Sequence, residues 1–373
     1  MSRVLVAMSG GVDSSVTAYL LGQQGYDCIG ATMRLYDNET IGESRQSTCC
    51  SIDDVFDARS VANRLDMDFF VFNFTESFQK DVICRFVHAY ETGITPNPCI
   101  DCNRYLKFER FYHRAREIEC DYIATGHYAR IEYNEASGRW LLKKALDDSK
   151  DQSYVLYSMT QDQLAHTLFP LGGLHKTQVR EIAEQQGFVN ARKHDSQDIC
   201  FVPDGDYAAF LRRFTGKDYP PGDFLDEHGD VLGRHKGIIH YTVGQRRGLG
   251  VSSSERLYVQ KTSVPDNTVT LTPLSGLFAP ALIADGLNLI SCDKLDGSTR
   301  VTARIRYHQP EQDAVVTQLD DNTIRVDFDQ PQRAISPGQA VVLYQGDTVV
   351  GGATIVAALG CVAIYGKAYS KNE

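Results

Sequence analysis

Three cysteines stand in sequence contexts that suit thiol chemistry. Cys99 and Cys102 form a C-x-x-C pair in TPNPCIDCNRYLKF, and Cys200 lies among polar residues in KHDSQDICFV. A C-x-x-C pair is half of a zinc site, a redox pair or a coincidence, and without a second C-x-x-C the zinc interpretation is weak. We expect a helix to start at about Asn103, and a helix N-terminus favours the thiolate form of a nearby cysteine. The pair is therefore a candidate for nucleophilic or redox chemistry.

A second candidate site lies at the start of the chain. The stretch SGGVDSS, from Ser9 to Ser15, follows the apolar strand RVLVAM and precedes SVTAYLLGQQGY, which has helical periodicity. Backbone N–H groups that converge at a helix N-terminus form an anion site. There is no Gly-Lys-Ser/Thr, which excludes a Walker A loop, and Asp13 offers a carboxylate for Mg²⁺. We predict a phosphate loop similar to the PP-loop of ATP pyrophosphatases; the alternative is a glycine turn with a serine N-cap.

Strands and helices alternate through the first half of the chain, which predicts an α/β fold with a doubly wound parallel sheet. Ligands bind such sheets at the carboxyl ends of the strands. Two further strand ends should face this crevice. In GATMRLYD, Met33 would pack on an adenine ring; in ATGHYAR, Gly126 would let a nucleotide approach and His127 would point outward. The alternatives are an ordinary core methionine and a capping histidine.

After about Phe201 strands dominate, which predicts a small central β-rich domain and then a C-terminal β-barrel or sandwich. The expected strands include GIIHYTVG. We place the domains at residues 1–205, 206–270 and 271–373. The uncharged span from Thr348 to Gly366 is rich in glycine and β-branched residues, so we interpret it as two buried strands around a turn, not as a membrane helix.

Composition restricts the function classes. The chain has 373 residues and a formal net charge of −10, which disfavours indiscriminate nucleic-acid binding but not a local basic face. The run from Arg234 to Arg247 contains basic residues and no acid, and it is either a phosphate-facing surface or a solvated loop. The first residues lack a signal-peptide pattern, so we expect a cytoplasmic protein with mostly reduced cysteines. Cys49 and Cys50 are interpreted as structural.

The motifs, taken together and in order, resemble those of the tRNA-specific 2-thiouridylases. They include AMSGGVDSSV, CCSIDDVFDAR, TGITPNPCIDCNRYLKF, DYIATGHYAR, SKDQSYVLY, DSQDICF, HYTVGQRRGLG, RIRYHQ and SPGQAVVLY. The resemblance implies a PP-loop domain of the adenine nucleotide α-hydrolase type. It also implies an enzyme that installs the 2-thio group on the wobble uridine of tRNAs for Lys, Glu and Gln. The implied protein is a monomer that acts on the anticodon stem-loop, away from any membrane.

The resemblance further implies that ATP and Mg²⁺ bind the loop and that AMP is transferred to O2 of the uridine. The implied nucleotide-binding residues are Ala7, Met8, Ser9, Gly10, Gly11, Val12, Asp13, Ser14, Met33 and Gly126. Cys200 would carry a persulfide received from a sulfur donor protein, either a cysteine desulfurase or a sulfur-relay protein. Cys102 would release sulfide from that persulfide, or resolve the disulfide after the persulfide attacks C2. Either route forms a Cys102–Cys200 disulfide that must later be reduced.

For RNA, the same resemblance implies a uridine that leaves its loop stack, which costs little in a single-stranded loop. The implied tRNA-contacting residues are Asn97, Pro98, Cys99, His127, Lys150, Asp151, Gln152, Arg306, Tyr307 and Gln339.

The chain departs from the family at Cys99, where many members carry Asp. If that Asp is a general acid or base, Asp101 is a candidate substitute. Alternatively, Cys99, Cys102 and Cys200 would hold a [4Fe–4S] cluster with one open iron site. The sequence is also compatible with two other function classes. One is another adenylating PP-loop enzyme, such as an amide-forming synthetase, and the other is a non-catalytic tRNA-binding protein.

Overall fold

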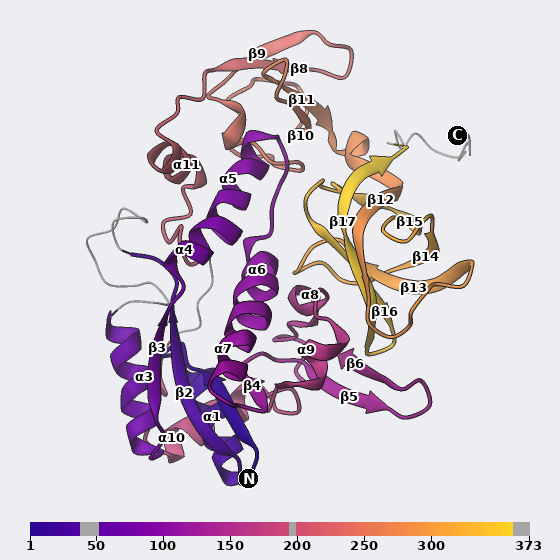
Figure 1. The fold of residues 1–373 in the computed structure, drawn as a ribbon. Coiled ribbons are helices and arrows are strands. Elements are labelled where there is room, and N and C mark those ends of the chain that lie inside the picture. Colours follow the sequence, from indigo (N-terminus) through magenta and orange to yellow (C-terminus); the bar gives the residue numbers. More distant parts are fainter. Residues whose placement is uncertain (38–51, 194–198, 361–373) are drawn as a thin grey trace.

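The protein is built from three sheets. The structure, a computed structural model, describes residues 1–37, 52–193 and 199–360. Within these residues lie a five-stranded sheet, a four-stranded sheet and an eight-stranded sheet that includes a closed barrel. In Figure 1 the five-stranded sheet and its helices lie at the lower left, the four-stranded sheet at the top and the barrel at the right.

The five-stranded sheet has the order β3-β2-β1-β4-β7. Every neighbouring pair in it is parallel, which confirms the predicted α/β fold. Its strands are β1 (Arg3–Ala7), β2 (Asp27–Arg34), β3 (Phe69–Asn73), β4 (Tyr122–Ala124) and β7 (Thr167–Leu168).

Helices cover both faces of this sheet because successive side chains of a strand point to opposite faces. Val4 and Val6 of β1 pack in one core cluster with the first helical layer. Leu5 belongs to the cluster on the other face. The first layer contains α1 (Val12–Gln23), α3 (Ile52–Arg64) and α10 (Lys176–Gln185). The second contains α4 (Thr75–Phe78), η1 (Gln79–Ile83), α5 (Cys84–Glu91), α6 (Pro98–Asp101), η2 (Cys102–Arg110) and α7 (Phe111–Glu117).

The central region forms a small sheet of order β10-β11-β8-β9 next to helix α11 (Tyr207–Thr215). Its strands are β8 (Gly222–Leu225), β9 (Val231–His235), β10 (Leu257–Ser263) and β11 (Thr268–Pro273). The strand predicted in GIIHYTVG is wrong, because Ile238–His240 is the 3₁₀ helix η3. Gly237 turns the chain there with φ +118, and a Cβ on it would lie 2.6 Å from the Tyr219 carbonyl oxygen.

The C-terminal region is a barrel rather than a sandwich. Its strands follow the order β12-β15-β14-β13-β16-β17, and a further pairing of β12 with β17 closes the ring. They are β12 (Phe278–Leu289), β13 (Ser298–Arg304), β14 (Gln312–Gln318), β15 (Ile324–Arg333), β16 (Ala340–Gln345) and β17 (Thr348–Leu359). The short helix η4 (Leu274–Leu277) leads into the barrel.

In the described part of the predicted span Thr348–Gly366, the first strand continues through Gly351 and Gly352 to Leu359, so the turn does not lie at these two glycines. These glycines serve close approach instead of a turn. A Cβ on Gly351 would lie 2.3 Å from the Asn288 carbonyl oxygen, and one on Gly352 would lie 2.6 Å from the Tyr157 ring. The end of the predicted span, residues 361–366, lies outside the described residues, as do Cys49 and Cys50.

A hairpin from the first half of the chain extends the barrel sheet. Strands β5 (Arg130–Asn134) and β6 (Arg139–Lys143) pair with each other, and Lys143 pairs with Thr348 of β17. The short helices α8 (Ser153–Leu156) and α9 (Gln161–Ala165) follow the hairpin and lie beside the barrel (Figure 1). Sequence analysis did not predict that this segment would join the C-terminal sheet.

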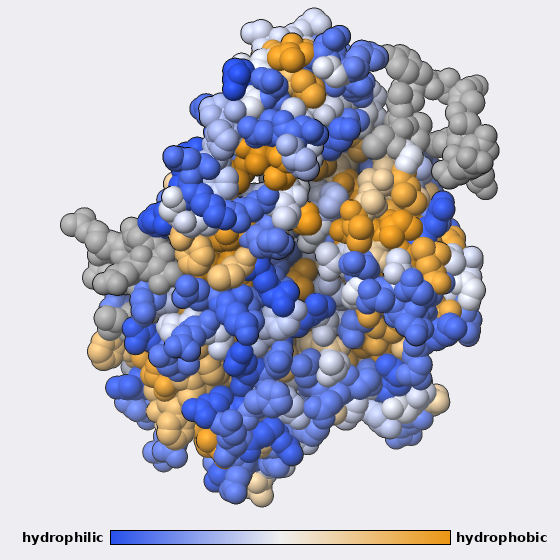
Figure 2. Space-filling view, turned by 45° about the horizontal axis from the view of Figure 1, so that its top comes forward, coloured by the Kyte–Doolittle hydropathy of each residue, from blue (hydrophilic) through white to orange (hydrophobic). Residues whose placement is uncertain are grey.

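The surface is mostly hydrophilic on the face shown in Figure 2, with hydrophobic residues in separate patches. Among the described residues, no helix has both the length and the apolar character needed to cross a membrane.

Candidate active site

The loop predicted to bind phosphate connects β1 to α1, which confirms its predicted place between a strand and a helix. Gly10 has φ +74, and a Cβ on it would lie 2.3 Å from the Asp54 carbonyl oxygen, so only glycine fits there. The Ser9 N–H donates to Ser14 Oγ at 3.2 Å, which fixes the turn. Gly11 is the N-cap of α1. The helix N-terminus therefore faces the space above the loop without a bulky side chain at the cap.

Asp13 in the first turn of α1 is held by two residues that sequence analysis missed. Lys176 Nζ lies 2.7 Å from both Asp13 carboxylate oxygens, and Tyr128 donates its hydroxyl to Asp13 Oδ1 at 2.8 Å. Gly126 packs against the same turn, since a Cβ there would lie 3.0 Å from Asp13 Cβ and from the Ser14 nitrogen. Tyr128 lies in ATGHYAR, one of the two strand ends that the sequence singled out, but nothing in the sequence pointed to Lys176.

The segment after α10 reaches the loop from the other side. Asn190 Nδ2 donates to the Gly10 carbonyl at 3.0 Å and to Ser15 Oγ at 2.9 Å. Lys193 Nζ donates to the same carbonyl at 3.3 Å and to Asp54 Oδ1 at 2.5 Å. Burial lowers the pKa of Lys193, but its hydrogen bonds to the acids raise it overall. Sequence analysis also missed these two residues.

The predicted nucleotide-binding residues lie at the carboxyl ends of neighbouring strands. The loop follows β1, Met33 lies near the end of β2, and Gly126 follows β4; β1 is paired with both of the other strands. Met33 is half-buried against the core cluster on the second face of the sheet, whereas Met8 is buried on the α1 side. The Met8 carbonyl accepts a 2.6 Å hydrogen bond from Thr32 Oγ1. These residues therefore lie together at the edge of the sheet where parallel α/β sheets bind ligands.

The cysteine pair lies inside a helix rather than before one. Helix α6 has Asn97 as N-cap and Pro98 in its first turn, so the predicted start at about Asn103 is wrong. Proline is favoured in a first helical turn because its missing N–H needs no partner there and its φ is pre-set. Cys99 is exposed and Cys102 is half-buried where the chain passes into the π-helix η2. A π-helical segment is rare and is often found at functional sites.

Cys102 and Cys200 pack against the same core cluster. Cys200 is half-buried, and its carbonyl accepts a 3.0 Å hydrogen bond from the Tyr36 hydroxyl. The next residue, Phe201, is buried against Phe86, with ring centroids 5.1 Å apart. The cysteine segments, which are distant in sequence, are thus anchored on one shared core.

Asp101, between the two cysteines of the pair, is half-buried. Burial raises the pKa of its carboxyl group to about 6, although Arg85 and Arg104 act in the opposite direction. The Arg85 guanidinium also lies 4.4 Å from the centre of the Tyr105 ring. Asp101 is consequently held in a cationic and aromatic setting.

Comparison with known proteins identifies the family. Three family models match: a tRNA methyl transferase HUP domain over residues 2–204, a tRNA methyl transferase PRC-barrel domain over 208–273 and an aminomethyltransferase β-barrel domain over 280–355. The tRNA-specific 2-thiouridylase MnmA 1 of Thermoanaerobacter pseudethanolicus is 52% identical to this chain, covering 95% of it and 98% of the relative. MnmA of Clostridioides difficile is 49% identical, with coverage of 95% and 98%. The chain belongs to the tRNA-specific 2-thiouridylase family.

Several residues implied by the 2-thiouridylase resemblance to contact tRNA make contacts within the protein. The prediction that His127 points outward is wrong. Its ring is buried between Phe108 and Phe169, and Nδ1 lies 2.6 Å from Thr125 Oγ1. Burial, and secondarily the charge of Lys107, holds the pKa of His127 well below its usual value. His127 is therefore a neutral core residue close to the end of β4.

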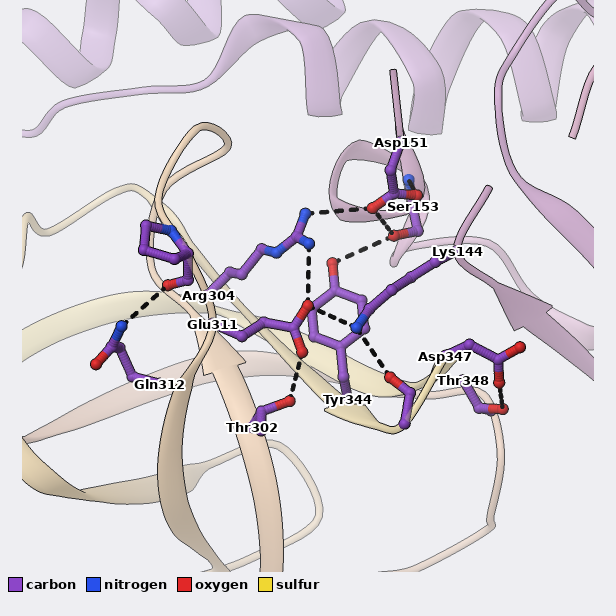
Figure 3. A network of polar contacts seen from close by, with 12 residues as sticks. Lys144, Asp151, Ser153, Thr302, Arg304, Glu311, Gln312, Tyr344, Asp347 and Thr348 are labelled. Carbon is purple, nitrogen blue, oxygen red and sulfur yellow. Dashed lines mark hydrogen bonds and ion pairs between the residues drawn. The ribbon is translucent and has the colours of Figure 1, made fainter. Parts of the chain in front are cut away.

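Asp151 is likewise a buried structural group. Figure 3 shows its carboxylate facing Ser153 and Arg304. Oδ1 accepts from the Ala145 and Ser153 N–H groups at 3.1 Å each, and Oδ2 is 3.2 Å from an Arg304 nitrogen. Arg304 also pairs with Glu311 at 2.9 Å. The network joins the segment after β6 to the barrel, and it leaves the Asp151 side chain only 1% exposed.

Two neighbours of Asp151 differ from it in exposure. Lys150 is half-buried. Gln152 is also half-buried, and its Oε1 accepts a 2.9 Å hydrogen bond from the Tyr128 N–H. Gln152 thereby links this segment to the residue that holds Asp13.

The barrel residues Arg306 and Tyr307 face other parts of the protein: Arg306 contacts the central region, and Tyr307 lies near the cysteine pair. One Arg306 nitrogen donates to the Val243 carbonyl at 3.1 Å, to the Ala334 carbonyl at 3.0 Å and to a serine hydroxyl. Burial lowers the pKa of Arg306. Burial first, and then nearby acidic groups that include Cys99, raises the pKa of Tyr307 to about 12. The barrel thus places a tyrosine in the electrostatic environment of the cysteine pair.

The residues present do not form a metal centre. Within residues 1–37, 52–193 and 199–360, no three His, Cys, Asp or Glu side chains gather closely enough to hold a metal ion. Cys99, Cys102 and Cys200 all belong to this part of the chain, so the structure does not bring together the three thiolates that a [4Fe–4S] cluster would need.

Proposed function

We propose that this chain is an ATP-dependent tRNA 2-thiouridylase that converts the wobble uridine of tRNAs for Lys, Glu and Gln to 2-thiouridine. The observation that carries the proposal is the 52% identity to a 2-thiouridylase over 95% of the chain. The position of the phosphate loop at the strand ends and the shared anchoring of Cys102 and Cys200 support it. An amide-forming synthetase would need the loop but neither cysteine.

In the first step, O2 of the uridine attacks the α-phosphorus of ATP and pyrophosphate leaves. The loop from Ser9 to Gly11 would bind phosphate oxygens through its N–H groups and the N-terminus of α1. The Asp13 carboxylate is already paired with Lys176, so Mg²⁺ would be held mainly by phosphate oxygens and water, which is its usual mode. Adenylation turns the uridine oxygen into part of a good leaving group, AMP.

In the second step, sulfur replaces that oxygen. Cys200 would receive sulfane sulfur from a donor protein, and the terminal sulfur of the persulfide would attack C2 as AMP leaves with O2. The Cys102 thiolate would then attack Cys200 Sγ, breaking the bond to the transferred sulfur and forming a Cys102–Cys200 disulfide. Alternatively, Cys102 would attack first, and the released sulfide would attack C2. A dithiol reductant must restore both thiols in either case.

For RNA binding we propose a contact surface around the cysteine pair, formed by residues with exposed atoms. These are Asn97, Cys99, Lys150 and Tyr307. Arg306, Gln339 and Gln152 use polar atoms in internal hydrogen bonds, and we assign His127, Asp151 and the buried Pro98 to supporting that surface. We further propose a cytoplasmic monomer with domains at 1–205, 206–270 and 271–373.

The experiment is to delete the gene and measure 2-thiouridine in bulk tRNA by nucleoside mass spectrometry. We expect its loss, with recovery from a plasmid copy and no recovery from C102S or C200S. C84S is the matched control, because Cys84 is exposed on a neighbouring helix and has no part in the proposed chemistry. Normal 2-thiouridine in the deletion strain would refute the proposal. Iron analysis and an absorption spectrum after anaerobic purification test the separate [4Fe–4S] hypothesis.

A further inference from the structure

The loop that leads into the cysteine helix is held by the C-terminal barrel. Gln339 Nε2 donates to the Thr95 and Pro96 carbonyls, at 3.0 Å each. The Thr95 N–H donates to the Pro337 carbonyl at 3.0 Å. These bonds satisfy three backbone groups of a short loop with atoms from a segment more than two hundred residues away in sequence. The Gln339 side chain thus pairs with backbone carbonyls that a turn would otherwise pair with nearby backbone N–H groups.

Gly338 lets the two segments approach. Its φ is +89, and a Cβ on it would lie 2.0 Å from Ile94 Cγ2 and 2.9 Å from the Thr95 oxygen. The barrel segment is itself fixed to β17, because Gly338 N donates to Ile355 O and Ile355 N donates to Gln339 O, both at 2.8 Å. The loop therefore rests on the connection between β15 and β16, which is itself hydrogen-bonded to β17.

The loop is stiff between this contact and the cysteines. Pro96 and Pro98 fix two φ angles, and Asn97 between them is the N-cap of α6. Cys99 is the next residue, and Cys102 lies about one helical turn further on. A shift of the Thr95–Pro96 carbonyls would consequently be transmitted to both cysteines rather than absorbed.

Other hydrogen bonds hold the two ends of the segment that contains this loop and the cysteine helix. Thr262 of β10 donates its hydroxyl to the Gly93 carbonyl at 3.1 Å, at the opposite end of the loop. The Tyr154 hydroxyl donates to the Ala340 carbonyl at 2.8 Å, and Asn103 Nδ2 donates to the Val155 carbonyl at 3.2 Å. The barrel thus anchors α8, and α8 in turn contacts the residue after Cys102.

We propose that Gly338 and Gln339 are positioning residues for the cysteine pair, so that the barrel forms part of the sulfur-transfer site. The assignment of Cys102 to sulfur transfer rests on the proposed function, but the positioning of its thiol does not. This role differs from a contact between Gln339 and tRNA, because it operates when no RNA is bound.

The test compares variants in tRNA-free enzyme. The readout is the iodoacetamide alkylation rate of Cys102 in reduced protein, resolved by peptide mass spectrometry, with exposed Cys84 as internal reference. Q339E places a carboxylate against the two carbonyls, whereas Q339K keeps a donor there. For Q339E we expect Cys102 alkylation to rise by about threefold or more and thiolation turnover to fall by about tenfold or more. For Q339K both should stay within about threefold of wild type.

G338A has a matched control in G346A. Gly346 is also a barrel glycine with positive φ, +61, but a Cβ on it would meet nothing within 4 Å. We expect G338A to behave like Q339E and G346A to behave like wild type. If G338A does not fold, the comparison of Q339E with Q339K stands alone. The affinity for ATP should change by less than about twofold in all variants, because the phosphate loop is a separate structure.

Unchanged Cys102 alkylation in both Q339E and G338A would overturn the proposal, even if tRNA affinity fell, because that pattern indicates an RNA contact. A wild-type enzyme that does not thiolate tRNA would instead refute the proposed function and leave the alkylation result interpretable.

Discussion

The ion pair between Lys176 and Asp13 predicts that ATP affinity depends on a lysine distant from the phosphate loop in sequence. Asp13 is the only charged residue between Ser9 and Ser15. The Lys176 side chain is 10% exposed and that of Asp13 is 31% exposed. K176Q would leave an uncompensated carboxylate in the first turn of the helix whose N-terminus must accept phosphate, where the charge opposes binding.

The magnitude follows from Coulomb's law. One helical turn and a side chain separate the carboxylate from a phosphate above the loop by about 7 Å. At an effective dielectric constant of about 40, for this partly exposed site, each phosphate charge is repelled by about 1 kcal/mol. Two nearby phosphate charges give about 2 kcal/mol, which is roughly a 30-fold weaker Kd for ATP. D13N/K176Q lacks both charges, so its Kd should return to within about threefold of wild type.

The assay is calorimetric titration of tRNA-free enzyme with ATP in EDTA, so that Mg²⁺ ligation by Asp13 does not contribute. K143Q is the matched control. Lys143 pairs with Glu132 at 3.0 Å on the β5–β6 hairpin, and its loss should leave the Kd unchanged. An unaltered Kd in K176Q, or a double variant as weak as K176Q, would refute the reasoning. The second result would assign Lys176 to direct phosphate contact or to structure alone.

Three further predictions concern stability. Because burial depresses the pKa of His127, the unfolded chain binds more protons below about pH 6.5 and stability falls as the pH drops. H127N should therefore show a shallower loss of Tm between about pH 6.5 and about pH 5 in thermal unfolding; equal slopes would contradict this. D151A leaves Arg304 without one of its two carboxylate partners and should cost about 3 kcal/mol in urea unfolding, more than D151N. Equal losses of unfolding free energy in D151A and D151N would contradict a specific effect of removing all of the Asp151 hydrogen-bond acceptors. G352A forces a methyl group against the Tyr157 ring and the Val341 carbonyl oxygen and should cost about 2 kcal/mol by the same method; a neutral result would show that both neighbours move away.

The sequence alone predicts elements whose signals are local. Alternating strands and helices predicted the parallel sheet, and short strands separated by turns predicted a barrel or a sandwich; the pairing of β12 with β17 decides for the barrel. The phosphate loop was predictable because Gly10, Ser14 and Asp13 lie together in seven residues between a strand and a helix. The helix start was placed too late, at about Asn103, because Asn97 and Pro98 were not recognised as an N-cap and a first-turn proline.

Tertiary structure decided what surrounds these local features. Lys176 reaches Asp13 from α10, and Gln339 reaches the cysteine loop from the barrel, across sequence separations of 163 and 244 residues. His127 and Asp151 look like polar surface residues in sequence, but packing buries both and supplies their partners. Hydrophobic periodicity and turn chemistry act over a few residues, so a sequence reveals them directly. Which distant side chain satisfies a buried charge or a loop carbonyl depends on how the three sheets pack, and one sequence does not contain that in any local pattern.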